Sequence, residues 1–172
     1  MAKKKTKSKS PRATRATAAP PIKVMLTRRA GAPARPAGTE LTKLFQRTWK
    51  LVPESRRADT LGQKRVAVDV LVIDDGEIAK LNVSHLKVRG PTDVLSFPMG
   101  EIDPERKAYH LGEVVVSYET ARREALSRKI PVEEELQRYC AHGFLHLLGY
   151  EDATHTQREE MFSIQEKALI RK

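Results

Sequence analysis

Residues 131–152 read PVEEELQRYCAHGFLHLLGYED, and their order predicts one long helix. Pro131 suits the first turn of a helix, because its missing N–H would have no partner there. Three glutamates at residues 133–135 follow it, where the helix dipole favours acidic side chains. Gly149 tolerates the left-handed conformation in which helices commonly end. We therefore expect a helix over residues 131–148.

Two histidines lie four residues apart on this helix. Four residues turn an α-helix by about 400°, so His142 and His146 project from one face and can share one metal ion. After Gly149 the chain can return Asp152 or His155 as a third ligand. Two histidines alone occur on many helices, but the added third ligand favours a metal site with an open position.

The histidine helix resembles the metal-binding helix of the zinc proteases, with one difference. Those enzymes use the glutamate beside the first histidine as general base. Gly143 occupies that position here and has no side chain. Peptide hydrolysis is therefore the least favoured function that we consider.

The net charge of the 172-residue chain is +10, and this excess lies in the first 40 residues. Residues 1–40 contain eleven Lys or Arg and one acid, whereas the rest contains 21 of each sign. We predict a disordered basic arm over residues 1–20 and a single α+β metal-binding domain over residues 21–172. The arm is either a solubilising tail or a phosphate-contacting segment. Its cations are Lys3, Lys4, Lys5, Lys7, Lys9, Arg12 and Arg15.

The composition also limits the compartment and the kind of site. No apolar run approaches the ~20 residues of a membrane span, and no signal-peptide core is present, so a cytoplasmic protein is expected. The basic, acid-poor N-terminus keeps an organelle transit peptide as the minority alternative. Cys140 is the only cysteine, which excludes an intrachain disulfide and a cysteine-rich zinc site. We expect it to be a buried, inert thiol.

Hydrophobic periodicity places the other elements. Strands are predicted at residues 22–26, 65–73, 94–97 and 113–117, with Pro98 closing the third and a hairpin-type connection over residues 100–112. Further helices are predicted from a Thr39 cap to Leu51, after an Asp74 or Asp75 cap, over residues 119–128, and over residues 156–170. This order indicates an α+β fold with a small mixed sheet of about four strands and about five helices.

Four stretches together resemble the YbeY family, bacterial rRNA maturation factors described as metal-dependent endoribonucleases. They are Leu81-Asn82, PTDVLSFP at residues 91–98, LGEVVVS at residues 111–117, and residues 142–152. The resemblance covers roughly residues 66–170. It implies a small sheet packed with helices around a zinc site.

By position, the resemblance implies that His142, His146 and residue 152 hold one zinc ion per chain. The family usually has histidine at the third place, where this chain has Asp152. A carboxylate is an accepted zinc ligand, although its charge makes the metal a weaker Lewis acid. His155 competes as the third ligand. Nickel and iron are rival metals for two imidazoles and one carboxylate.

A second departure follows Leu81-Asn82, where the family carries Tyr-Arg. His85 and Leu86 stand there instead, so the family's arginine is missing. Lys87 and Arg89 are weak candidates for phosphate contact, and only arginine offers a bidentate fork. No residue is identified as general base, so a metal-bound water is the expected catalytic participant.

These features favour a single-strand-directed, metal-dependent endoribonuclease in rRNA maturation. The resemblance implies processing of the small-subunit rRNA 3′ end, with roles in ribosome biogenesis and quality control. The expected partners are rRNA and ribosomal particles, with no membrane and no disulfide-linked partner. The alternative from another class is a non-catalytic ribosome-assembly or RNA-binding factor with a structural metal. A metallopeptidase is the third hypothesis.

Overall fold

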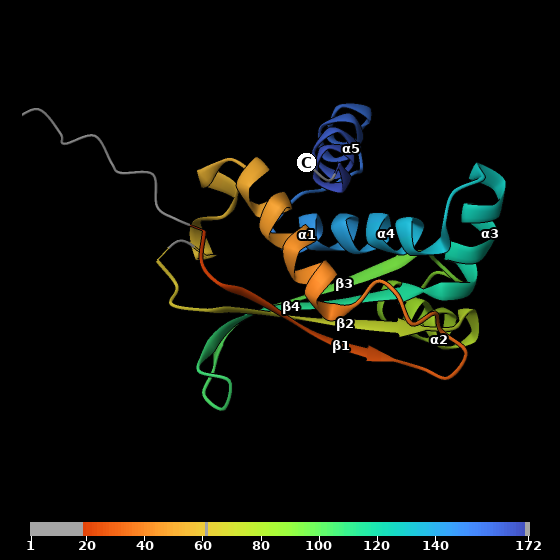
Figure 1. Cartoon of the computed structure of the whole chain (residues 1–172), viewed down its shortest axis with the longest axis horizontal. Coiled ribbons are helices and arrows are strands. Elements are labelled where there is room, and N and C mark those ends of the chain that lie inside the picture. Colours follow the sequence, from red (N-terminus) through yellow and green to blue (C-terminus); the bar gives the residue numbers. More distant parts are fainter. Residues whose placement is uncertain (1–18, 61, 171–172) are drawn as a thin grey trace, which may run out of the picture.

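The computed structural model describes residues 19–60 and 62–170. The predicted arm cations, Lys3 to Arg15, lie outside these residues. The described part is a mixed sheet with helices, which confirms the α+β class and the predicted order of elements (Figure 1). The elements are β1 (Ile22–Arg28), α1 (Gly38–Leu51), β2 (Val66–Ile73), α2 (Asp75–Leu86), β3 (Val94–Asp103), β4 (Ala108–Ser117), α3 (Tyr118–Arg128), α4 (Val132–Leu147) and α5 (His155–Leu169), with short 3-10 turns at Glu54–Arg56 and Ala58–Thr60.

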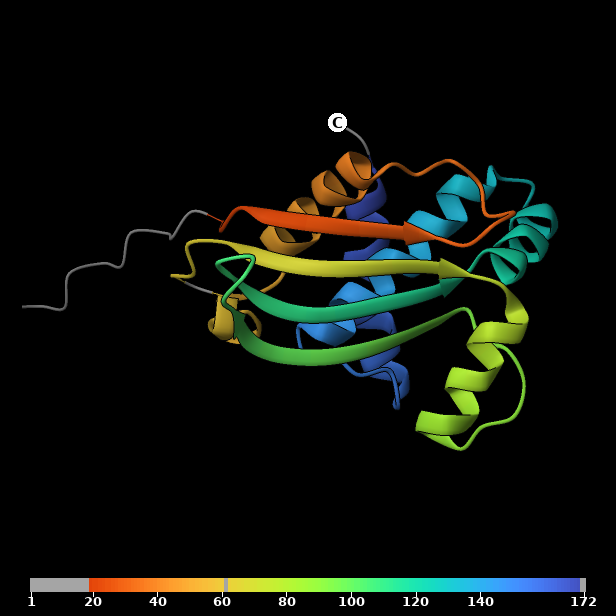
Figure 2. The same cartoon turned by 90° about the horizontal axis from the view of Figure 1, so that it is seen from below.

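The strand order is β1-β2-β4-β3. β1 and β4 both run parallel to the central β2, and β3 pairs antiparallel with β4. Helices α1 and α4 cover one face of the sheet, and α5 lies on their outer side (Figure 1). Figure 2 shows the opposite face, where α2 lies toward one end of the strands. Helix α4 is thus enclosed between the sheet and α5.

The core follows from the apolar periodicity of these elements. Strand β2 alternates Val66, Val68 and Val70 toward the helices, and all three are buried. Phe45 of α1 stacks on Phe144 of α4 with ring centroids 4.4 Å apart. Burying a side chain of this size stabilises a fold by about 1.5–3 kcal/mol. This core fixes how α1 and α4 lie on the sheet.

The predicted buried residues are largely confirmed. Trp49 lies in the core, and its indole N–H donates to Thr60 Oγ1 over 2.8 Å. Cys140 is buried, and burial raises the pKa of its thiol to about 12. The spacing of Ala121, Ala125 and Leu126 predicts that all three lie on one side of their helix, but Leu126 is 82% exposed whereas the two alanines are buried. The α3 register turns Leu126 toward solvent.

Three predicted boundaries were wrong. Strand β3 continues through Pro98 to Asp103, and β4 begins at Ala108 instead of residue 113, so the hairpin turn is much shorter than the predicted connection. Proline is tolerated there because β3 is an edge strand, where a missing N–H need not break the ladder. Helix α1 begins at Gly38 after Ala37, so Thr39 is not its cap. The Glu40 carboxylate instead accepts the Ala37 backbone N–H over 2.8 Å.

Helix α4 touches the sheet most closely at Gly143. A Cβ built there would lie 2.5 Å from Val114 Cγ1, 2.9 Å from Val94 Cγ2 and 3.0 Å from Ser96 Oγ. Ser96 Oγ also donates to the Gly143 carbonyl over 3.0 Å. The glycine is therefore a packing requirement: a glutamate at this position has no room.

Within the described ranges, no helix has the length and apolar character needed to cross a membrane.

Substituting Gly143 should destabilise the fold. The Ala methyl group must push α4 away from β3 and β4, so we expect Gly143→Ala to lower the free energy of unfolding by about 1–3 kcal/mol in urea titrations. Gly76→Ala is the matched control, because its Cβ meets only Asp74 Oδ1 at an ordinary 3.4 Å. This control should be neutral or more stable by about 0.5–1 kcal/mol. Equal stability of Gly143→Ala and wild type would contradict the packing argument.

Candidate metal site

The two histidines of α4 and the loop after it form a compact group of donors. His142 Nε2 lies 3.1 Å from His146 Nε2 and 3.6 Å from Asp152 Oδ2. One ligand atom from each residue lies within 4.8 Å of the other two. Gly149 adopts φ 80° after the helix, which turns the chain back toward the histidines. The structure thus brings together the three residues proposed from sequence.

The outward nitrogens of both rings are held by hydrogen-bond acceptors. His142 Nδ1 lies 3.1 Å from Gln165 Oε1, and His146 Nδ1 lies 2.9 Å from the Tyr150 carbonyl. The Gln165 amide is oriented by Glu166, whose Oε1 accepts the Gln165 Nε2 proton over 3.0 Å. Each neutral ring therefore carries its proton on Nδ1. Both Nε2 lone pairs are left facing the same small space.

This donor arrangement fits a metal ion. Two lone pairs 3.1 Å apart beside a carboxylate repel one another unless a cation lies among them. A tetrahedral zinc with bonds of about 2.0–2.2 Å holds its donors roughly 3.3–3.5 Å apart, which lies between the two measured distances. Burial, and next the neighbouring His146, lower the pKa of His142 and favour its neutral, metal-binding form.

His155 is placed less favourably as a ligand. It begins α5, its side chain is 77% exposed, and its Nδ1 lies 3.5 Å from Glu159 Oε2. Among the described residues, it is not part of the donor group that contains Asp152. The geometry therefore favours Asp152 over His155 as the third ligand.

A cleft of about 410 Å³ opens beside the donor group. His142 and Asp152 lie in its wall together with three arginines, Arg128, Arg138 and Arg158. The proposed phosphate contacts Lys87 and Arg89 are not among its lining residues. The Lys87 ammonium instead donates to the carbonyl of Ser84 in its own helix over 2.9 Å.

The sequence analysis missed these arginines. Arg138 precedes His142 by four residues and so lies on the same face of α4, a spacing that could have identified it. Arg128 ends α3 and Arg158 lies in the first turns of α5. They reach the cleft only through the packing of these helices around α4, so no local pattern points to them.

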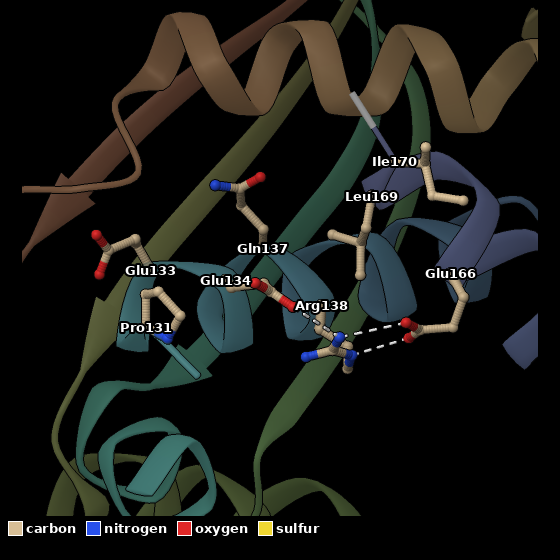
Figure 3. Close-up of a pocket in the computed structure, with 8 residues that line it drawn as sticks. All are labelled: Pro131, Glu133, Glu134, Gln137, Arg138, Glu166, Leu169 and Ile170. Carbon is tan, nitrogen blue, oxygen red and sulfur yellow. Dashed lines mark hydrogen bonds and ion pairs between the residues drawn. The ribbon is translucent and has the colours of Figure 1, made fainter. Parts of the chain in front are cut away.

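Arg138 is already neutralised by carboxylates. Its guanidinium donates to Glu135 Oε2 over 2.6 Å and to Glu166 Oε1 over 2.8 Å. Figure 3 shows the paired bonds to Glu166, beside a second cleft of about 390 Å³ between α4 and α5. The hydrogen bond to Glu166 is the largest of the effects that raise the Arg138 pKa. Arg128 and Arg158 are thus the cleft cations most available to a ligand.

Comparisons of this chain with known proteins gave matches to one family. The family model described as Endoribonuclease YbeY matches residues 35–171. An Endoribonuclease YbeY of Aquifex aeolicus is 42% identical over 113 residues, covering 65% of this chain and 73% of that protein. Another from Thermobifida fusca is 39% identical over 107 residues, covering 59% and 69%. A Thermotoga maritima protein of known solution structure is 28% identical, with 86% of both chains covered and a TM-score of 0.47.

Zinc binding should depend on His146 and Asp152 and should not depend on His155. We expect about one zinc per chain by elemental analysis in wild type and in His155→Ala, and little zinc in His146→Ala or Asp152→Ala. Added zinc at about 100 times its Kd should stabilise wild type and His155→Ala against unfolding by ~2.7 kcal/mol. The same zinc concentration should stabilise His146→Ala and Asp152→Ala much less. Zinc retained by Asp152→Ala but lost by His155→Ala would reverse the assignment of the third ligand.

Proposed function

The chain belongs to the YbeY family of endoribonucleases, and from this premise we propose that it is a metal-dependent endoribonuclease acting on single-stranded RNA. The observation that carries the proposal is the donor group of His142, His146 and Asp152 at the wall of a cleft. His142 and Asp152 line that cleft, and three protein ligands would leave a fourth position on a metal ion for water or substrate.

Zinc is the metal that we propose for this site, at one ion per chain. Two imidazoles and one carboxylate suit zinc, and the distances of 3.1 Å and 3.6 Å from His142 Nε2 to the other two donors are close to those between zinc ligands. When bound, the ion would supply a Lewis acid for a phosphoryl oxygen or for a water nucleophile. Asp152 is 47% exposed on its side chain, so the site is open to solvent and substrate.

The protein's own groups bind and orient the substrate. Arg128 and Arg158 line the cleft from opposite helices and can neutralise phosphate oxygens on either side of the scissile bond. His142 and His146 keep fixed orientations through Gln165 and the Tyr150 carbonyl. The two arginines, as positive groups held in the cleft, would stabilise the extra charge of a phosphoryl-transfer transition state.

The cellular role that we propose is maturation of rRNA in the cytoplasm. The resemblance to rRNA maturation factors supports processing of the small-subunit 3′ end and association with ribosomal particles. Roles in ribosome biogenesis and quality control follow from the same resemblance. The basic residues before residue 19 would add salt-sensitive RNA affinity, because phosphate contacts release counterions.

The alternative is a ribosome-assembly or RNA-binding factor whose metal stabilises the fold. It is favoured by one observation: Leu86, which replaces the family's arginine, is 60% exposed and offers no charge to RNA. A metallopeptidase is disfavoured by the crowding around Gly143, which leaves no room for a glutamate general base.

The enzyme proposal predicts metal-dependent cleavage of unpaired RNA. The substrate is a single-stranded RNA fragment with the sequence of the rRNA 3′ end. The zinc-loaded protein should cleave this fragment and leave a duplex of the same sequence intact. His146→Ala should lose at least about 100-fold in rate, since removing a ligand removes the charge at the reacting centre. Leu126→Ala is the control and should retain its rate, because Leu126 is an exposed residue outside the cleft.

The opposite outcome separates the two functions. Intact RNA after incubation with protein that carries stoichiometric zinc would reject the enzyme proposal. If such an inactive protein still bound ribosomal particles and restored their assembly, the assembly-factor alternative would be supported.

A further inference from the structure

An exposed aromatic ring stands in the wall of the metal cleft. Phe162 of α5 is 57% exposed and lines the same cleft as His142 and Asp152. The apolar neighbours Met161 and Ala168 of the same helix are buried. A phenylalanine that lies in a cleft without being buried offers its face to a ligand. We propose that Phe162 and Arg158 form a nucleotide subsite that stacks one RNA base and holds the adjoining phosphate beside the metal site.

Arg158 is fixed in position for this role. It lies four residues before Phe162, so both side chains leave α5 on the same face. Its Nη1 donates to the carbonyls of Asp152 over 2.8 Å and Ala153 over 3.1 Å. These bonds tie the guanidinium to the loop that carries the proposed metal ligand. Its Nε and Nη2 make no hydrogen bond with the described residues, so these two nitrogens can donate to phosphate oxygens.

The opposite wall supplies a second cation. Arg128 at the end of α3 makes only loose ion pairs, at 3.8 Å to Glu135 and 4.0 Å to Glu124. Its side chain is 48% exposed. An aromatic side chain and two cations in the wall of one cleft are the combination with which proteins bind single-stranded nucleic acid, because every base has a π-face. The occupant that fits is therefore a single-stranded RNA segment, and this inference rests on the proposed function.

Binding of an uncuttable oligonucleotide tests the subsite separately from catalysis. The probe is a labelled 2′-O-methyl phosphorothioate strand with the sequence of the RNA fragment, titrated with zinc-loaded protein. We expect Phe162→Ala to raise the Kd by roughly 5- to 100-fold, the range for a lost base stack, and Phe162→Trp to retain wild-type affinity. Leu126→Ala is the matched control, because Leu126 is an exposed apolar residue outside the cleft. Zinc content should be equal in all four proteins.

Each outcome decides between the two proposals. Equal Kd values for Phe162→Ala and wild type would overturn the subsite, even if the protein cuts RNA. Loss of affinity in Phe162→Ala, with a cuttable RNA left intact by wild type, would retain the subsite and reject the enzyme proposal. A wild-type protein that does not bind the probe would overturn the subsite as well.

A separate observation concerns the far side of His142. Gln165 is 4% exposed, its Oε1 accepts from His142, and its Nε2 donates to Glu166, which Arg138 holds over 2.8 Å. A carboxylate can only accept, so Glu166 fixes which end of the amide faces the ring. We infer that Gln165 is a positioning residue, which keeps the proton on Nδ1 and so directs Nε2 toward the metal.

Zinc affinity and ring tautomer test this role without reference to RNA. Gln165→Leu should bind zinc about 10- to 100-fold more weakly, because it removes the acceptor that holds His142 Nδ1. Nitrogen-15 NMR of the zinc-free protein should show the His142 ring protonated on Nδ1 in wild type and a mixture of tautomers in the Leu variant. Gln137→Leu is the control, because Gln137 is an equally buried amide of α4. A folded Gln165→Leu protein with unchanged zinc affinity and tautomer would overturn the inference.

Discussion

The close contact of α4 with the sheet at Gly143 is the constraint on which the site depends. Val114, Val94 and Ser96 surround the position where a Cβ would stand, so the helix backbone rests directly on β3 and β4. His142 directly precedes this contact and His146 lies about one turn after it. A side chain at residue 143 would therefore shift both proposed ligands together. The same contact that sets the metal donors also excludes the general base of the zinc proteases.

Beyond that contact, the site is supported by α5 more than by the sheet. Gln165 orients His142, while Glu166 and Arg138 join α5 to α4. Arg158 of the same helix holds the carbonyls of the loop that carries Asp152. Helix α5 thus orients His142 and also holds the loop that carries Asp152.

The sequence predicted what local patterns determine. Residues 131–149 carry both helix-end signals of α4, and Asp74 caps α2 as expected, since its side chain accepts from Glu77 N. The extension of β3 through Pro98 depends on that strand lying at the sheet edge, which is a tertiary property. The roles of Arg128 and Phe162 likewise arise only when α3 and α5 pack around α4. Local sequence cannot report such contacts.

Asp152 and Leu86, the two departures from the family pattern, both make the site less positive. An aspartate in place of a histidine lowers the charge of a zinc site by one, and Leu86 in place of arginine removes another positive group. RNA cleavage adds negative charge to a phosphate that is already anionic, so the missing charge must come from elsewhere. Arg138 cannot supply it fully, because Glu135 and Glu166 both bind its guanidinium. In the enzyme that we propose, the compensation would therefore fall on Arg128 and Arg158, which line the cleft from helices that the family motifs do not include.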